Sequence, residues 1–254
     1  MKHFLITLLL CASSLHAQNP LKGEWITSSL LRDFKEEYKN LFVLTQREGE
    51  RVGYATEFEK NDKNQYISYY FAPCGNDCFP SVSGTFKLIA PSYVRLNALT
   101  FEQTGDCKHK NEKLHNDTAD YYIYKVSDKK IFLVKSTSRN EKEDGEKAKN
   151  YLLVTDIKYN LVYDRKYKMK VETKGIAPLP AQIEEYATNI LQLKEFKILI
   201  YNQLRGAAVW VFAVKDLTTG VITYVTQQNY IDTGGKEAAR FFDCTEAEME
   251  KFRQ

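Results

Sequence analysis

The strongest constraint on the fold is a succession of short strand-like segments between residues 22 and 135, where no stretch keeps a helical period. Each segment is rich in β-branched and aromatic residues and is bounded by turn residues. The predicted strands are residues 23–30, 41–47, 51–60, 65–71, 83–89, 93–103, 120–126 and 130–136. Many short strands without intervening helices are typical of a β-sandwich or a β-barrel. We therefore expect a mainly β fold.

The strand predicted at residues 51–60 has one apolar face and one polar face. Side chains alternate between the two faces of a strand, so residues of even number share one side. Those residues are Val52, Tyr54, Thr56 and Phe58, and the residues between them are Gly53, Ala55, Glu57 and Glu59. Because a slip of one residue would expose the apolar set, the register of this strand is well specified.

A hairpin is predicted around residues 90–92, and its register can be tested against the sequence. If Phe86 lies opposite Leu96 and Leu88 lies opposite Val94, one face of the hairpin is entirely apolar. The residues between them are then polar on the opposite face. This agreement between pairing and pattern indicates that the hairpin covers a core with one of its faces.

Four cysteines, Cys74, Cys78, Cys107 and Cys244, lie beyond the first 17 residues. An even number of cysteines in an exported chain favours disulfides. Extending the hairpin register toward its open end places Cys107 opposite the segment between Cys74 and Cys78. We therefore expect Cys107 to be bridged to one of these two, and the other to reach Cys244. The alternative is a zinc site of Cys74, Cys78, Cys107 and His109, although the ligand spacing is loose.

The first 17 residues have the layout of a secretory signal peptide. A basic start precedes an apolar run at residues 4–12, and small and polar residues follow as far as Ala17. The run is too short for a transmembrane helix, which needs about 20 apolar residues. We expect cleavage after Ala17 and a secreted or periplasmic protein without a transmembrane segment. Acylation of Cys11 is the alternative, but Leu10 before it is larger than lipoprotein processing favours.

A charged run at residues 139–150 interrupts the strand pattern. Such a run, which contains one glycine, is typical of an exposed linker. We place a domain boundary there. The sequence thus predicts a barrel domain at residues 20–139 and a smaller C-terminal domain at residues 150–254.

The C-terminal domain combines strand and helix signals. Predicted strands lie at residues 151–157, 161–171, 196–201, 208–214 and 221–226. Pro180 occupies the first turn of an amphipathic helix. Thr245 and Glu248 form a capping box at the start of a final helix. We therefore expect an α+β region after the barrel.

The N-terminal half resembles the lipocalin family in two motifs. Residues 23–25 read Gly-Glu-Trp at the start of the first predicted strand, where that family has Gly-x-Trp. Residues 119–124 read Ala-Asp-Tyr-Tyr-Ile-Tyr and match the family's Thr-Asp-Tyr-x-x-Tyr except at the first position. Arg139 is the candidate for the family arginine that packs on the motif tryptophan. The resemblance implies an eight-stranded antiparallel lipocalin-like (calycin-type) barrel over residues 21–139. Trp25 would close one end, its N–H reaching a carbonyl.

An eight-stranded barrel is either filled by its own side chains or wide enough for one small ligand. The predicted inward residues combine aliphatic and aromatic side chains with tyrosine hydroxyls, which suits an apolar guest. They are Val52, Tyr54, Phe58, Phe86, Leu88, Val94, Leu96 and Tyr124. The predicted function is therefore binding of a small hydrophobic ligand in the barrel. The alternative is an interaction module with a filled barrel, whose C-terminal half docks an envelope or extracellular protein.

The sequence contains no arrangement typical of an enzyme. His109 and His115 are the only histidines beyond residue 17, and both lie in a polar segment, so no nucleophile and base are paired. A Gly-x-Ser-x-Gly motif and a glycine-rich phosphate loop are both missing. The net charge is +3 and no basic stripe is present, which gives no case for nucleic acid. We expect a non-catalytic protein without a cofactor or a metal site.

Overall fold

Eight strands in the first half form a closed antiparallel barrel, as the strand pattern predicts. The computed structural model describes residues 19–36, 39–59, 64–157, 165–204 and 208–253, so the predicted signal peptide lies outside the described residues. The strands are β1 (Gly23–Thr27), β2 (Leu41–Gln46), β3 (Gly53–Phe58), β4 (Gln65–Phe71), β5 (Cys78–Ala90), β6 (Tyr93–Gly105), β7 (Lys110–Ser127) and β8 (Lys130–Ser136). Each strand predicted in this half is confirmed, and β5, β6 and β7 are longer than predicted.

The strand order departs from a simple up-and-down barrel at one place. Strands β3 to β8 follow one another as neighbours, but β1 lies between β2 and β3, and β2 closes the barrel by pairing with β8. In an up-and-down barrel each strand lies beside the next strand in the sequence. The barrel is thus consistent with a lipocalin-like architecture in strand number and closure, with β1 and β2 exchanged.

The hairpin of β5 and β6 has the predicted register in its central part, where Phe86 lies opposite Leu96 and Leu88 lies opposite Val94. Beside the turn the pairing shifts, so that Ala90 lies opposite Tyr93, and it shifts by one residue again at Gly84. A Cβ atom at Gly84 would lie 2.5 Å from the Tyr66 ring and from the backbone oxygen of Asn97, so only glycine fits at this irregularity.

Of the two predicted disulfides, one is confirmed and the other is wrong. Cys78 and Cys107 are bridged, with 5.4 Å between their Cα atoms, and this bond removes two of the four ligands of the alternative zinc site. Cys74 is free and exposed, and Cys244 is free and buried. Cys244 ends a strand inside the core of the second domain, where burial raises the pKa of its thiol to about 11. The predicted bridge from the barrel to Cys244 therefore does not exist.

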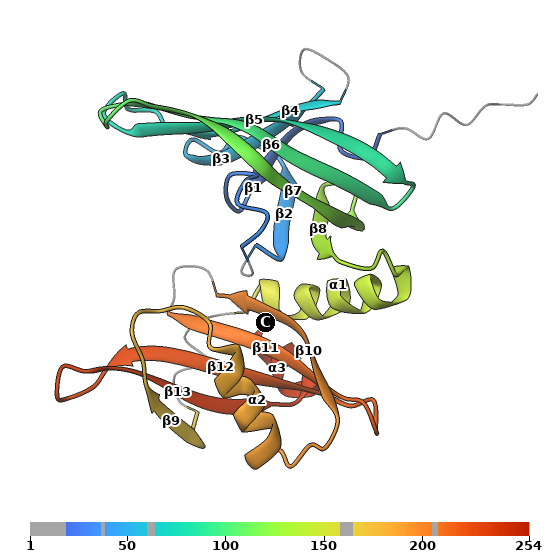
Figure 1. Cartoon of the computed structure of the whole chain (residues 1–254), viewed down its shortest axis with the longest axis vertical. Coiled ribbons are helices and arrows are strands. Elements are labelled where there is room, and N and C mark those ends of the chain that lie inside the picture. Colours follow the sequence, from blue (N-terminus) through green and yellow to red (C-terminus); the bar gives the residue numbers. More distant parts are fainter. Residues whose placement is uncertain (1–18, 37–38, 60–63, 158–164, 205–207, 254) are drawn as a thin grey trace, which may run out of the picture.

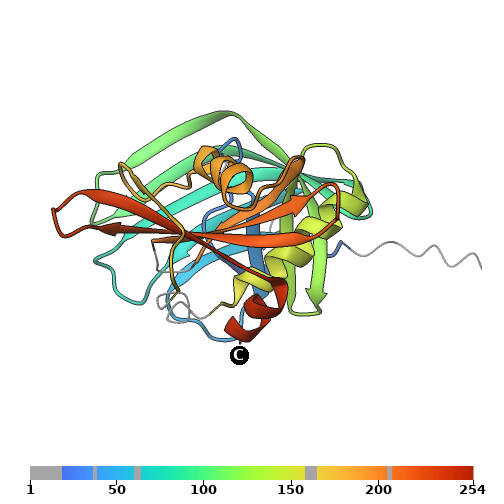
Figure 2. The same cartoon turned by 90° about the horizontal axis from the view of Figure 1, so that it is seen from below.

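The second domain is a five-stranded antiparallel sheet with helices on both faces. Its strand order is β10 (Phe196–Gln203), β11 (Val209–Asp216), β12 (Ile222–Ile231), β13 (Glu237–Cys244) and β9 (Met169–Glu172). Helix α2 (Pro180–Asn189) packs on one face, and α3 (Glu246–Phe252) packs on the other. Figures 1 and 2 show α2 and α3 on opposite faces of the sheet. The predicted Pro180 start and the Thr245 capping box are both confirmed, whereas β13 was not predicted.

The charged run predicted as a linker is a helix, α1 (Glu141–Thr155), and the strand predicted at residues 151–157 is wrong. The Asn140 side chain accepts hydrogen bonds from two N–H groups of the first turn and so begins the helix. Ala148, Tyr151 and Val154 are buried at a spacing of three residues, while Glu141, Lys142 and Lys149 are exposed. The linker prediction was wrong because these charges belong to a helix that lies between the barrel and the second sheet (Figure 1).

Candidate ligand site between the two domains

Most of the predicted ligand-binding residues meet inside the barrel. Phe58, Phe86, Val94 and Leu96 are buried in one apolar cluster, and Tyr54 and Leu88 pack against it. Phe58 and Phe86 form an edge-to-face pair with 5.2 Å between ring centroids. The sequence therefore identified the barrel core.

Two of the predicted residues do not face this core. Val52 lies at the bend before β3 and is 57% exposed, because the strand begins at Gly53, two residues later than predicted. Tyr124 packs on the outside of the barrel, in the cluster that joins it to α1 and the second sheet. On β7 the inward residues are Tyr121 and Ile123, so Tyr124 has the opposite orientation.

The barrel interior also holds a segment of the connection between β1 and β2. Leu30, Leu31 and Phe34 of this connection are buried in the barrel cluster. The Phe34 ring packs against Phe42 and Tyr121, with centroid distances of 6.0 and 5.7 Å. We call residues 30–34 the plug segment. It occupies the interior volume that a ligand would need.

Hydrogen bonds hold the plug segment in place. The Leu31 N–H donates to Ser68 Oγ at 3.1 Å, and the Tyr66 hydroxyl donates to the Leu31 carbonyl at 3.0 Å. The Asp117 carboxylate accepts from the backbone N–H groups of residues 33 and 34, each at 2.7 Å. Burial raises the pKa of Tyr66 well above its ordinary value, so its hydroxyl remains a donor. The only sequence signal for the plug was three apolar residues between two strands.

Trp25 has the predicted structural role. Its side chain is buried in the barrel cluster, and its indole N–H donates to the Leu21 carbonyl at 2.9 Å. Arg139, the candidate for an arginine packed on this ring, instead pairs with Asp120 at 2.6 Å. The motif tryptophan is thus part of the core and takes no part in an accessible site.

An open cleft of about 660 Å³ lies where the barrel, α1 and the second domain meet. Tyr122 and Tyr124 come from the outer face of β7, Leu152 comes from α1, and Ile222 and Tyr224 come from β12. Ligand sites commonly have this size, and they are frequent at domain interfaces.

Charged side chains from α1, β11 and α3 surround this apolar wall. The basic residues are Lys142, Lys149, Lys215 and Arg253, and the acidic residues are Glu141, Glu146, Glu246 and Glu250. The charges of the lining residues therefore balance. Sequence analysis missed this set because α1 was interpreted as a linker and the final helix as a closing element.

Helix α1 fixes the barrel side of the cleft through a buried carboxylate. Asp144 is fully buried and accepts hydrogen bonds from the Tyr93 hydroxyl at 3.0 Å and from Ser136 Oγ at 2.5 Å. Lys147 of the same helix forms an ion pair with Asp144 at 3.2 Å. Burial and the hydrogen bond to Asp144 raise the pKa of Tyr93, which keeps its hydroxyl protonated. The helix is therefore anchored to β6 and β8.

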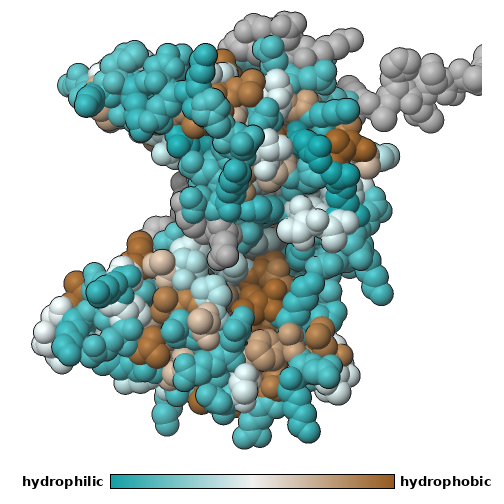
Figure 3. Space-filling view, viewed as in Figure 1, coloured by the Kyte–Doolittle hydropathy of each residue, from teal (hydrophilic) through white to brown (hydrophobic). Residues whose placement is uncertain are grey.

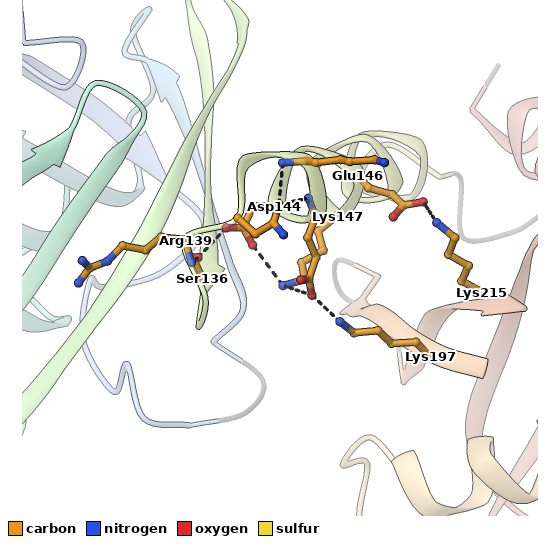
Figure 4. A network of polar contacts seen from close by, with 10 residues as sticks. Ser136, Arg139, Asp144, Glu146, Lys147, Lys197 and Lys215 are labelled. Atoms are coloured by element: carbon orange, nitrogen blue, oxygen red, sulfur yellow. Dashed lines mark hydrogen bonds and ion pairs between the residues drawn. The ribbon is translucent and has the colours of Figure 1, made fainter. Parts of the chain in front are cut away.

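The other side of α1 is bonded to the second sheet (Figure 4). Each of three strands contributes one contact. These contacts are Lys197 Nζ with Glu143 Oε1 at 2.5 Å, Lys215 Nζ with Glu146 Oε1 at 2.5 Å, and the Tyr224 hydroxyl, which donates to Asn150 Oδ1 at 2.6 Å. One apolar cluster also runs from β8 through α1 to β10, β11 and α3. The barrel side and the sheet side of the cleft are thus held in fixed positions relative to each other.

A second hollow of about 680 Å³ lies on the polar outer face of the barrel. Its lining includes Thr85, Lys87, Arg95 and Asn97, together with Asn64, which directly follows residues outside the described chain. Most of these side chains are polar or charged. The interdomain cleft combines apolar and charged groups from three parts of the fold, and it is the stronger candidate.

No protein-family model, curated protein or solved structure was found to match this chain. Across the described ranges, no group of three or more His, Cys, Asp and Glu side chains is placed to hold a metal ion. No helix in those ranges is long and apolar enough to cross a membrane. The site must therefore be interpreted from its own chemistry.

Proposed function

We propose that this chain is an exported, non-catalytic binding protein in which the barrel is a scaffold and the interdomain cleft receives the ligand. One observation carries the proposal: the plug segment occupies the barrel interior, whereas the cleft is open and lined by three parts of the fold. Rigid walls that bring apolar and charged groups together favour binding of a partner of mixed chemistry.

Export is supported by two features. The first 17 residues have the composition of a cleavable signal peptide. The Cys78–Cys107 disulfide fits an oxidising compartment, such as the periplasm or the extracellular space. Intact-mass measurement of the exported protein should give a chain that begins at Gln18. A mass that includes Met1, or an acylated Cys11, would contradict this part of the proposal.

A relationship to the lipocalin family is also part of the proposal. It is supported by the closed eight-stranded barrel and by the buried Trp25 of the Gly-x-Trp motif. The prediction of a small hydrophobic ligand inside the barrel stays a prediction. For such a ligand to enter, the plug segment would have to leave and its hydrogen bonds to Ser68, Tyr66 and Asp117 would have to break.

Two tryptophan variants distinguish binding in the barrel from binding in the cleft. Native mass spectrometry of protein from its own producer, with organic extraction, would first detect any co-purifying molecule. Leu152→Trp should abolish its retention, because the indole fills the cleft. Leu96→Trp should retain the molecule but lose roughly 1–3 kcal/mol of stability, because the indole overpacks a filled core. Loss of the molecule in Leu96→Trp alone would favour the barrel as the binding site.

A second candidate function is docking of a protein partner on the second domain. Most of the exposed large apolar side chains in the described chain belong to this domain, including Leu217 and Val221 beside the turn between β11 and β12. Figure 3 shows apolar residues gathered on the second domain, while the same face of the barrel is mainly hydrophilic. Exposed apolar residues that cluster mark interaction surfaces.

The docking candidate is tested by capture from an extract of the producing cells. The double variant Leu217→Ser and Val221→Ser should lose the captured partner while its melting temperature is unchanged. Val52→Ser on the barrel is the matched control, because Val52 is exposed to a similar degree. Equal capture by the double variant and the control would remove this candidate.

A further inference from the structure

We infer that the interdomain cleft binds a small amphipathic anion, namely an aromatic or aliphatic body that carries one carboxylate. This inference rests on the proposed function of the cleft and names the class of its ligand. Some charged groups of the cleft already have partners, and others do not.

The acidic groups of the cleft are largely engaged. Glu146 is paired with Lys215 at 2.5 Å, and the Glu141 carboxylate accepts a hydrogen bond from Ser92. Glu250 lies 3.4 Å from Arg253. Glu246, on the exposed side of α3, is the acid of the lining that has no partner among the described residues. A cationic ligand would therefore find one free carboxylate.

The basic groups are less engaged. Lys142 and Lys149 lie on the cleft side of α1, seven residues and thus about two turns apart, and both are exposed. Neither ammonium group has an ion pair or a hydrogen bond within the described chain. Both ammonium groups are therefore available to a ligand at no cost in existing contacts.

Arg253 is the third cation of the lining, and its existing ion pair with Glu250 is long. Its Nη1 lies 3.4 Å from each carboxylate oxygen of Glu250, which is longer than the 2.7–2.9 Å of a good charge-assisted hydrogen bond. Its Nε is buried and has no acceptor in the described structure. A buried N–H without a partner is uncommon and costs free energy. A ligand carboxylate that drew the guanidinium into the cleft would give these donors an acceptor.

The apolar wall determines the rest of the ligand. Tyr122 and Tyr124 are half-buried neighbours on the outer face of β7, with 6.5 Å between their ring centroids. Leu152 and Ile222 are also half-buried and line the same cleft. This wall can cover a flat or branched hydrocarbon body, and Lys142, Lys149 and Arg253 in the same lining are the cations that its charged end can reach. The combination favours an anion over a neutral or cationic molecule with the same body.

Three probes with one hydrocarbon body test the inference: 4-phenylbutyrate, 4-phenylbutan-1-ol and 4-phenylbutylamine. Each is titrated into the full-length exported protein, with the tyrosine ring signals in NMR spectra as the readout. The carboxylate should bind roughly tenfold more tightly than the alcohol, since a hydrogen bond to a charged group is worth more than a neutral one. The amine should bind most weakly, and added salt should weaken binding of the carboxylate only.

Lysine-to-glutamine variants show which positive charges bind the carboxylate. The double variant Lys142→Gln and Lys149→Gln should lower carboxylate affinity to about that of the alcohol, without a change in melting temperature. Lys174→Gln is the matched control, because Lys174 is exposed, has no partner among the described residues and lies outside the cleft. Its affinity should be unchanged.

The outcomes separate this inference from the proposed function. If all three probes shift the Tyr122 and Tyr124 signals with equal affinity, the anion preference is overturned and the cleft remains the binding site. If none of them shifts these signals, both are overturned. An equal loss of affinity in Lys174→Gln would also overturn the inference, because it would indicate a general charge effect.

Discussion

The barrel interior and the interdomain cleft are lined by similar side chains but differ in what fills them. Both combine tyrosine rings with aliphatic residues. In the barrel, a segment of the chain supplies Leu31 and Phe34 to the centre and is held there by hydrogen bonds. In the cleft, Lys142 and Lys149 have no partner and Arg253 has a poor one. An apolar lining therefore does not by itself identify a ligand site.

The difference indicates how the two regions contribute to the whole protein. The barrel interior is a core whose burial stabilises the fold, and changes there should appear first as lost stability. The cleft is formed by elements that meet across α1, and changes at its rim should leave stability nearly unaltered. Variants in the two regions should therefore differ in how much stability they lose.

Removing the plug ring should have the largest effect on stability. Phe34→Ala should lower the free energy of unfolding by about 3–5 kcal/mol, the usual cost of deleting a buried phenylalanine. Urea unfolding provides the measurement, and Val52→Ala, at an exposed position, should change it by no more than about 0.5 kcal/mol. A loss below about 1 kcal/mol for Phe34→Ala would mean that the plug does not fill the barrel.

Removing the disulfide should destabilise the barrel without affecting the cleft. The bridge joins residues 29 positions apart, and the chain-entropy relation gives about 3.5 kcal/mol for a loop of that length. The double variant Cys78→Ala and Cys107→Ala should lose about this amount in urea unfolding, while 4-phenylbutyrate affinity is unchanged. Cys74→Ala is the control, because this thiol is free and exposed. An equal effect of Cys74→Ala would contradict the assigned pairing.

Removing the buried carboxylate of α1 should weaken the connection between the two domains. Asp144→Ala leaves the Tyr93 and Ser136 hydroxyls without their acceptor and reduces the partners of Lys147 to Glu143, at a cost of about 3 kcal/mol. Calorimetry should then resolve two thermal transitions. Lys197→Gln breaks the exposed ion pair with Glu143. This variant should lose less than about 1 kcal/mol of stability and should keep a single thermal transition. A single unshifted transition for Asp144→Ala would contradict the role of α1.

The smallest effect concerns α3, which carries Arg253. The hydrogen bond from Arg165 and the capping bond from the Thr245 N–H lower the pKa of Glu248 to about 2 from its ordinary value of 4.5. Because the folded pKa is depressed, this stabilisation is present above about pH 4.5 and is lost as the pH falls toward 2. Glu248→Gln should therefore cost roughly 0.5 kcal/mol at pH 7, the modest value expected for a partly exposed pair.

The pH dependence separates this contribution from a general charge effect. Urea unfolding at pH 7 and near pH 2 should show that the difference between wild type and Glu248→Gln disappears at the lower pH. Glu184→Gln, on the exposed side of α2, is the control and should show no such dependence. A difference that persisted at low pH would mean that ionised Glu248 does not cap α3.

Alternation along the strands made most of the barrel predictable from the sequence. The pairing of Phe86 with Leu96 follows from local pattern alone, and so does the burial of Phe58. The plug segment was not predictable, because its burial depends on Ser68 and Asp117, which lie 37 and 84 residues from their respective partners. Helix α1 was missed because its charged residues outnumber the buried ones and Gly145 suggested a loop.

The cleft could not have been derived from sequence reasoning of this kind. It exists only where β7, α1, β12 and α3 meet, and these elements are brought together by tertiary packing. Tyr124 illustrates the limit: its residue type suits a binding wall, as predicted, but it faces the second domain and not the barrel. The sequence could thus indicate a residue type that suits a binding wall, but it could not indicate the surface to which that residue belongs.

The most direct test of the account follows the plug and the cleft in one NMR experiment. Nuclear Overhauser contacts between the Phe34 ring and the rings of Phe42 and Tyr121 should be present in the free protein, since their centroids lie 6.0 and 5.7 Å away. On addition of 4-phenylbutyrate these contacts should persist while the Tyr122 and Tyr124 signals shift. Loss of the Phe34 contacts on addition of the probe, with the Tyr122 and Tyr124 signals unchanged, would contradict the account and identify the barrel as the binding site.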